Sequence, residues 1–159
     1  MRGRVLLHAP RVRFSLQVQY AICGAFDLAY NGQGEPVQIR VISQRQAIPA
    51  RYLEQIFQRL RRAGLVVSKR GPGGGYTLSR PPRQITLREV VEAVEGSLLD
   101  AAGMERAGPG PSLRPDFLWR NLALRMGDVL DSTSLEDLCR EAIRADVGRA
   151  HPGAPMYFI

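Results

Sequence analysis

The sequence IPARYLEQIFQRLRRAGLVVSKRGPGGGYTLSR, residues 48–80, decides the fold because it joins a helical pattern to a hairpin pattern. Its first apolar residues recur at i, i+3, i+4 and i+7, which places them on one face of a helix that ends at Gly64. A β-rich run from Leu65 to Lys69 then leads through a glycine turn to a second short strand. The apolar helix residues are Leu53, Ile56, Phe57 and Leu60, and the second strand is Tyr76, Thr77 and Leu78.

The segments before this stretch supply the other helices of a winged helix-turn-helix. Ser15 suits the N-cap of a first helix that runs to about Tyr30. Residues 38–45 fit a short second helix, and Pro49 suits the first position of the third. Helix, short helix, turn, helix and hairpin is the order that such a domain needs. Inward positions are predicted for Leu16, Tyr20 and Cys23 of the first helix and for Ile39 and Ile42 of the second.

The second half of the chain is predicted to be helical. Thr86 and Glu89 form a capping box that opens a helix ending near Glu95. Pro115 begins a long helix to about Leu130, whose apolar stripe is broad enough to face both its own core and a second chain. Ser134 caps a last helix with Leu135, Leu138, Cys139 and Ile143 as its apolar residues. The predicted dimerisation residues are Phe117, Leu118, Trp119, Leu122, Met126, Val129 and Leu130.

These elements predict a mainly α fold with a small β-hairpin wing, a winged helix-turn-helix followed by a long dimerisation helix. We divide the chain into a basic arm (1–13), a winged helix-turn-helix domain (14–96), a loop (97–113), the dimerisation and C-terminal helices (114–147) and a tail (148–159).

Charge separates the two halves of the chain. Residues 1–85 hold 14 Lys+Arg against 3 Asp+Glu, a net charge of +11, whereas residues 86–159 hold 8 against 12, a net charge of −4. A general preference for arginine explains why Lys69 is the only lysine, but it does not explain why acids avoid the first half. The asymmetry predicts a polyanionic partner for the first half.

The third helix and the hairpin carry the side chains suited to double-stranded DNA. Arg51 matches the two acceptors of guanine, Glu54 the amino group of cytosine, and Gln55 adenine. Glycines let the hairpin backbone approach DNA, and Lys69 and Arg70 beside them suit a minor groove or phosphates. The full predicted set is Ser15, Arg51, Tyr52, Glu54, Gln55, Arg59, Arg62, Lys69, Arg70, Gly71, Gly73 and Gly74, with Arg59 and Arg62 assigned to phosphates.

Other classes of protein fit the residues less well. The glycine run joins two strands and is followed by Tyr76, so it matches neither a P-loop nor a dinucleotide fingerprint. No nucleophile and base are grouped, which argues against an enzyme. No apolar run reaches the ~18 residues of a membrane span, so we expect a cytoplasmic protein. Cys23 and Cys139 lie 116 positions apart and form no metal-ligand spacing.

The stretch from Phe14 to Gly96, above all YLEQIFQRLRRAGLVVSKRGPGGGYTLSR followed by ITLREVVEAVEG, closely resembles the IscR-type (Rrf-two) family of bacterial winged-helix transcription regulators. The resemblance implies a homodimer at a roughly palindromic operator, with recognition helices in major grooves and wing arginines in minor grooves. Tyr52, Glu54, Gln55 and Arg70 fall on positions that the family uses for DNA. Pro49 departs from the small polar residue often found there, which puts one contact in doubt.

A larger departure concerns the iron–sulfur cluster that some family members carry. Those members place three closely spaced cysteines between the capping-box helix and the long helix, and the cluster needs such thiolates. The stretch from Ser97 to Leu113 contains no Cys and no His. The resemblance therefore carries over DNA binding but not the cluster, and we predict a repressor without a cluster and without another cofactor.

The residues leave alternatives open. In one, a thiol or small ligand in the second half controls DNA binding, since Arg140 beside Cys139 would lower the pKa of that thiol, whereas Cys23 is expected to be inert. A small-molecule effector or a partner protein would fill the same role. In another, the chain is a sequence-tolerant nucleic-acid or protein-interaction module. The apolar end, residues 156–159, either docks on a partner subunit or is disordered.

Overall fold

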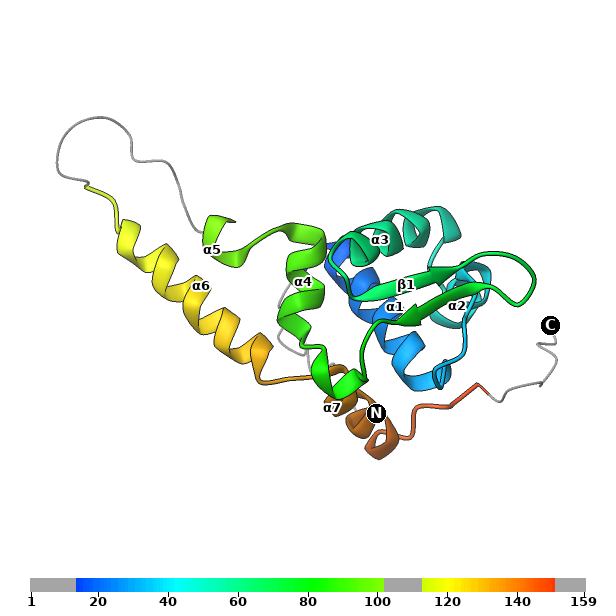
Figure 1. Cartoon of the computed structure of the whole chain (residues 1–159). Helices are drawn as coiled ribbons and strands as arrows, with labels where there is room; N and C mark the ends of the chain where they lie inside the picture. Colours follow the sequence, from blue (N-terminus) through cyan, green and yellow to red (C-terminus); the bar gives the residue numbers. More distant parts are fainter. Residues whose placement is uncertain (1–13, 102–112, 151–159) are drawn as a thin grey trace, which may run out of the picture.

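The structure, a computed structural model, describes residues 14–101 and 113–150 (Figure 1). The predictions for the basic arm, for residues 156–159 and for most of the 97–113 loop lie outside these ranges. The first part holds α1 (Leu16–Asn31), α2 (Ile39–Gln46), α3 (Ala50–Arg62), β1 (Val66–Lys69) and β2 (Gly75–Leu78). A 3-10 turn, η1 (Pro82–Gln84), leads to α4 (Leu87–Glu95), α5 (Leu98–Ala101), α6 (Asp116–Asp131) and α7 (Leu135–Arg144).

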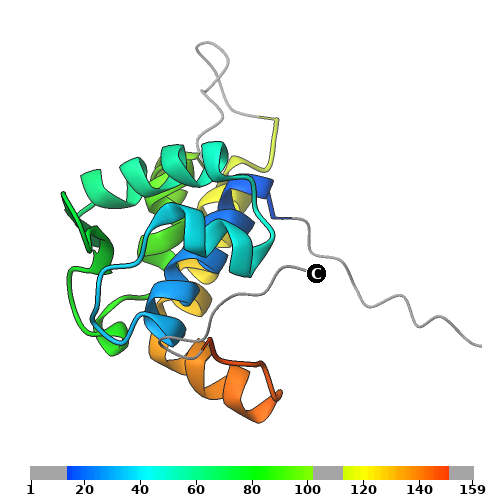
Figure 2. The same cartoon turned by 90° about the vertical axis from the view of Figure 1, so that its right-hand side faces the viewer.

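Helix α1 is the centre of the fold and packs against α2, α3, α4 and α7 (Figure 2). Its crossing with α3 is close because Gly24 has no side chain. A Cβ at this position would lie 2.7 Å from Cε2 of Phe57. Phe57 and Ile42 are fully buried in the same core, so α2 and α3 share one apolar contact surface with α1.

The hairpin is antiparallel, with Val66 opposite Leu78 and Lys69 opposite Gly75. An unpredicted bridge joins Val37, just before α2, to Tyr76 of β2. The amide of Val37 donates to the Tyr76 carbonyl at 2.9 Å, and the Tyr76 amide donates to the Val37 carbonyl at 2.8 Å. The wing is thereby fixed to the start of the helix-turn-helix.

The mainly α fold with a hairpin wing is confirmed, and so are the caps at Ser15, Thr86 and Ser134. One predicted inward position is wrong. Leu16 is 61% exposed because its turn begins before α1 reaches the core. Among the apolar residues of α7, Ile143 is exposed, because the buried face of the helix follows Leu135, Cys139 and Ala142.

Two boundaries also differ from the predictions. Pro49 is the N-cap of α3 instead of its first residue. The short helix α5 lies inside the predicted loop, directly after α4. Among the described residues, no helix is long and apolar enough to span a membrane.

Candidate nucleic-acid interface

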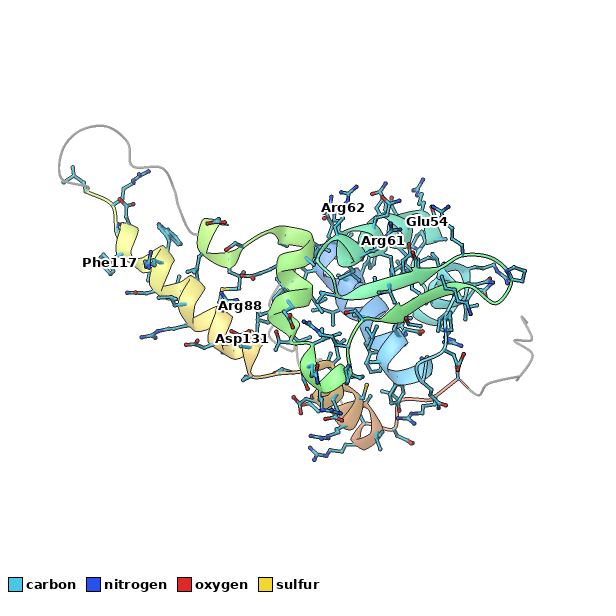
Figure 3. The ribbon with its side chains drawn as sticks, in the orientation of Figure 1. Glu54, Arg61, Arg62, Arg88, Phe117 and Asp131 are labelled. Carbon is cyan, nitrogen blue, oxygen red and sulfur yellow. The ribbon has the colours of Figure 1, made fainter. Side chains whose placement is uncertain are left out.

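Helix α3 turns a polar face to solvent because its apolar residues are buried beneath it. Leu53, Phe57 and Leu60 are fully buried in the core. In Figure 3, Glu54 and Arg62 point away from the body of the molecule. The exposed polar residues of α3 are Arg51, Glu54, Gln55, Gln58, Arg61 and Arg62.

Arg51 and Tyr52 form a unit at the start of this face. The Arg51 guanidinium lies 4.7 Å from the centre of the Tyr52 ring, and its Nη2 donates to the tyrosine hydroxyl at 3.0 Å. The Tyr52 ring in turn lies 6.2 Å from that of Tyr20 in α1. Stacking on the ring restricts the rotamers of Arg51, so its predicted guanine contact starts from a partly organised side chain.

Glu54, Gln55 and Arg62 are exposed and make no side-chain hydrogen bond within the ranges that the structure describes. Their polar groups are therefore free to exchange water for DNA. A base edge or a phosphate can be bound here without breaking an intramolecular bond.

Arg59, predicted to contact phosphates, already has two intramolecular partners. Its Nη1 donates to the carbonyl of Val94 in α4 at 3.1 Å and also to the Gln17 side chain of α1. The side chain is half-buried between these helices. Both bonds come from Nη1 and hold α3 against α1 and α4, while Nη2 and Nε keep donors that a phosphate could accept from, so the phosphate contact stays a prediction.

The hydroxyl of Ser15 also has intramolecular partners. It accepts from the amide of Val18 at 3.2 Å as the cap of α1, and it donates to the carboxylate of Glu95. Its predicted DNA contact stays a prediction, and it would share the hydroxyl with these bonds.

The tip of the wing depends on glycine. Gly71 and Gly73 have φ values of +90° and +73°, which side chains rarely adopt. A Cβ on Gly74 would lie 2.3 Å from the Lys69 carbonyl oxygen. The tip is therefore a narrow backbone turn, and Lys69 and Arg70 are exposed beside it.

The wing and α3 are also joined through Arg61, a residue outside the predicted set. Its Nη1 donates to the Ser68 hydroxyl of β1 at 3.4 Å. The cationic residues of α3 and the wing thus lie on connected surfaces. This arrangement suits contact with the phosphate backbone of DNA between one groove and the next.

A second feature missed by the sequence analysis is a cavity of about 590 Å³ between the start of α2 and the wing tip. Gln38, Arg40, Gly73 and Gly74 contribute to its lining. Arg40 is exposed, and its Nη2 donates to the Gln38 side chain at 3.3 Å. The position of Arg40 on the polar face of a short basic helix is the signal from which the sequence analysis could have identified this residue.

Helix α6 extends away from the rest of the molecule (Figure 1) and carries most of the predicted dimerisation residues on its surface. Phe117 and Val129 are 72% and 67% exposed. Leu130 differs, because it is 9% exposed and belongs to the chain's own core. Exposed apolar residues of α6 are Phe117, Leu118, Trp119, Leu122, Leu124, Met126 and Val129, of which Leu124 was not predicted.

The thiols do not have the environment of reactive cysteines. Burial raises the pKa of Cys23 and, as the main cause, that of Cys139. The predicted effect of Arg140 on Cys139 is wrong, because Arg140 pairs with Glu136 at 2.9 Å and with Asp137 at 3.4 Å. Arg149 is the cation that lowers the pKa of Cys139, and its effect is smaller than that of burial.

Comparisons with known proteins agree with this geometry. A family model described as Rrf2, iron-dependent transcriptional regulator, matches residues 14–141. The chain is 42% identical over 139 residues to the HTH-type transcriptional regulator IscR of Xenorhabdus nematophila, covering 86% of this chain and 84% of that protein.

Solved structures show the same likeness. The T. potens IscR structure is 34% identical with a TM-score of 0.70, covering 87% of this chain and 94% of its own. The structure of CymR, the global cysteine regulator of B. subtilis, is 32% identical with a TM-score of 0.67, covering 82% and 98%. These relatives are regulators, not enzymes.

The iron dependence in the family description does not fit the donors of this chain. Its two cysteines and two histidines are Cys23, Cys139, His8 and His151, and none lies between residues 97 and 113. Across residues 14–101 and 113–150, no three His, Cys, Asp or Glu side chains are grouped to hold a metal ion. The residues that hold a thiolate-bound cluster are missing from the sequence itself.

Proposed function

Because this chain belongs to the Rrf2 family of transcriptional regulators, we propose that it is a homodimeric repressor that binds an inverted-repeat operator in the cytoplasm without an iron–sulfur cluster. DNA binding and transcriptional regulation follow from the family. One observation carries the proposal further. The exposed residues of α3 and the wing tip form a connected cationic surface. Buried residues of α3 and of the hairpin belong to one shared core, which holds the two elements in place.

The homodimer is supported by α6. Its exposed residues include Phe117, Trp119 and Leu122, which together present an aromatic and aliphatic surface on a projecting helix. A patch of this kind is unfavourable in water and is typical of a subunit interface. A twofold dimer places two recognition helices on symmetric half-sites, so the operator is expected to be an inverted repeat.

Repression needs no further domain. A dimer bound across promoter DNA occupies the major and minor grooves that polymerase would otherwise contact. The function without a cluster follows from the donor set, since no thiolates lie where the cluster-binding relatives have them.

The test is selection of genomic DNA fragments by the purified full chain at about physiological salt, followed by sequencing. An enriched inverted repeat together with a dimeric mass by sedimentation supports the proposal. Arg70→Ala should weaken binding to that repeat, whereas Arg144→Ala on α7 should leave it unchanged. A folded protein that enriches no sequence, or that binds random DNA as well as the best fragment, contradicts the proposal.

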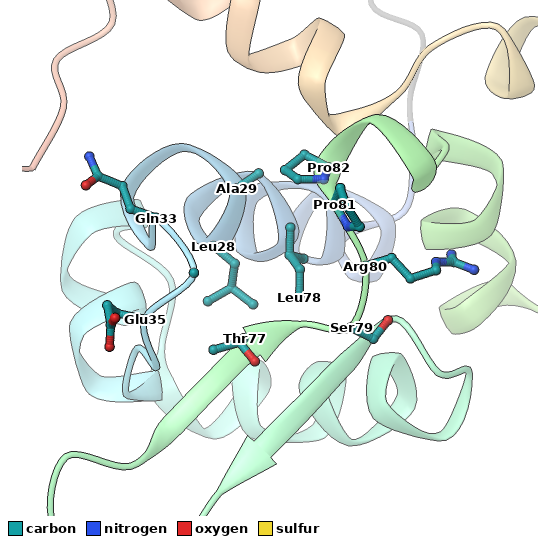
Figure 4. Close-up of a pocket in the computed structure, with 11 residues that line it drawn as sticks. Leu28, Ala29, Gln33, Glu35, Thr77, Leu78, Ser79, Arg80, Pro81 and Pro82 are labelled. Carbon is teal, nitrogen blue, oxygen red and sulfur yellow. The ribbon is translucent and has the colours of Figure 1, made fainter.

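A second candidate function is regulation by a small molecule, and a pocket at the base of the wing favours it. The pocket has a volume of about 400 Å³ and lies between α1 and β2. Leu28 and Leu78 point into it, and Pro81 and Pro82 close one end (Figure 4). A ligand bound there would contact both α1, on which the helix-turn-helix packs, and the wing.

This alternative is tested by thermal unfolding in the presence of a library of small metabolites. A ligand that raises the unfolding temperature and changes operator affinity supports it. Ala29→Leu, which fills part of the pocket, should abolish that shift while DNA binding without ligand persists. If every ligand acts equally on Ala29→Leu, the pocket is not the site.

A further inference from the structure

The end of the described chain folds back on α1. After α7, residues 147–150, which we call the strap, run past the C-terminal end of α1 (Figure 1). The Tyr30 hydroxyl donates to the Val147 carbonyl at 2.8 Å, and the Arg149 guanidinium lies 4.6 Å from the centre of the Tyr30 ring. The amide of Ala150 donates to Oδ1 of Asn31 at 2.9 Å. Three separate contacts therefore hold the strap.

Asn31 connects the strap to a buried carboxylate. While its Oδ1 accepts from Ala150, its Nδ2 donates to Oδ2 of Asp27 at 3.2 Å. An amide group has one accepting and one donating end, so both contacts require the same orientation. The strap consequently fixes the rotamer in which Asn31 faces Asp27.

Asp27 in turn holds the end of α2. It is fully buried, and its Oδ1 accepts from Arg45 at 3.1 Å while its Oδ2 accepts from Gln46 at 2.9 Å. A buried carboxylate is tolerated only with such partners. Arg45 and Gln46 immediately precede Ala47, whose φ of +54° makes the turn into α3. The hydrogen bonds thus run from the strap to the turn of the helix-turn-helix.

We propose that Asn31 and Asp27 are positioning residues through which the strap sets the placement of α2, and with it the turn that orients α3. The inference rests on the proposed function for its effect on DNA. Displacement of the strap frees the Asn31 amide to rotate, leaves Asp27 with one partner fewer and loosens the end of α2. The strap is therefore a point from which operator affinity can be lowered without any change in the residues that contact DNA.

Apolar packing between α1 and α7 is separate from this network. Tyr30 stacks on Phe26 with ring centres 5.0 Å apart, and it clusters with Cys139 and Ala142. Tyr30→Phe keeps that packing and removes only the hydroxyl that donates to the Val147 carbonyl. Asn31→Asp keeps an acceptor for Ala150 but replaces the donor with a carboxylate that faces Asp27.

The experiment is hydrogen exchange by mass spectrometry on the free full-length protein and these two variants. In Tyr30→Phe, amides of α2 should exchange about fivefold faster, the effect of one lost hydrogen bond. In Asn31→Asp the acceleration should be larger because two carboxylates repel each other. Amides of α4 serve as the internal reference, and Asn121→Asp on exposed α6 makes the same chemical change elsewhere.

Unchanged exchange in α2 in Tyr30→Phe, or equal acceleration in α2 and α4, would overturn the proposal. If Asn31→Asp fails to fold, Tyr30→Phe alone decides. Operator affinity should fall by the same factor as the protection of the α2 amides from exchange. Exchange is measured without DNA, so it tests the hydrogen-bond network independently of the proposed function. A wild-type protein that binds no operator would refute the proposed function but would leave the exchange result valid.

Discussion

Nη1 of Arg88 in α4 donates to the carboxylate of Asp131 at the end of α6 at 2.9 Å (Figure 3). The same guanidinium donates to Glu92 at 3.2 Å, and the hydrogen bond to Asp131 is the main reason that the pKa of Arg88 is raised. A Cβ on Gly127 would lie 3.1 Å from Nη1 of Arg88, so the arginine lies directly over α6. Since α4 packs on α1 and α3, Arg88 ties the long helix to the DNA-binding helices.

The first prediction concerns this tie. Arg88→Met should leave α6 less rigidly oriented, so that the two DNA-binding halves of the dimer tolerate a wrong half-site spacing better than the wild type does. The measurement is affinity for inverted repeats whose spacing is changed by one base pair. Arg140→Met, which removes an arginine from exposed ion pairs on α7, is the control. If a change of one base pair in spacing reduces the affinity of the wild type and of Arg88→Met by the same factor, the prediction is contradicted.

A second prediction separates two arginines of α3. Arg59→Leu should lower the free energy of unfolding by about 1 kcal/mol, because it removes partly exposed bonds to α1 and α4. Arg62→Ala should leave unfolding nearly unchanged but reduce the salt dependence of DNA binding by about one released counterion. Denaturant unfolding and salt titration of DNA affinity measure the two effects. A reduced salt slope in Arg59→Leu without loss of stability would instead support Arg59 as a phosphate ligand.

Local patterns in the sequence predicted most of the fold, because helix periodicity and caps depend on neighbouring residues. The stripe that includes Leu53 and Phe57 is buried as expected, and the capping box at Thr86 is present. Long-range pairings could not be predicted in this way. Nothing in its sequence context distinguishes Arg59 from Arg62, since its partners lie 42 and 35 positions away.

Asp27 shows the same limit for buried charge. An acid in the middle of a helix is expected at the surface, because burial of a carboxylate without partners is costly. Its partners Arg45 and Gln46 come from the next helix and reach it only in the folded protein. The bridge between Val37 and Tyr76 was missed for a similar reason, since a single residue in a connection has no strand pattern.

A third prediction tests base recognition by Glu54. Glu54→Ala should relax base preference at one position of each half-site by about 1–3 kcal/mol, because the carboxylate accepts from a cytosine amino group. Selection of binding sites from a randomised operator measures the preference. Gln58→Ala, on the same exposed face, should leave all positions unchanged. An unchanged preference in Glu54→Ala would assign recognition to other residues.

A fourth prediction separates the dimer surface from the core of α6. Val129→Glu should dissociate the dimer while each subunit stays folded, because a charge is placed on an exposed apolar surface that the dimer would bury. Leu130→Ala should instead lower the free energy of unfolding by about 2–5 kcal/mol, as a cavity in the core does. Sedimentation equilibrium and thermal unfolding distinguish the two. A stable Val129→Glu dimer would show that the subunits associate through another surface.

The last prediction concerns Cys139 as a redox sensor. Burial favours its neutral thiol and raises its pKa, so less thiolate is present at neutral pH than in a free cysteine. In the Cys23→Ser background, Cys139 should react with iodoacetamide more slowly than free cysteine at pH 7.5. Its rate should also keep rising at pH values where free cysteine has levelled off, because the raised pKa moves ionisation upward. Fast alkylation at neutral pH, with operator affinity lost on oxidation and protected by Cys139→Ser, would instead establish a thiol switch. Slow alkylation excludes a thiol switch at Cys139 and leaves a small molecule or a partner protein as the candidate signal.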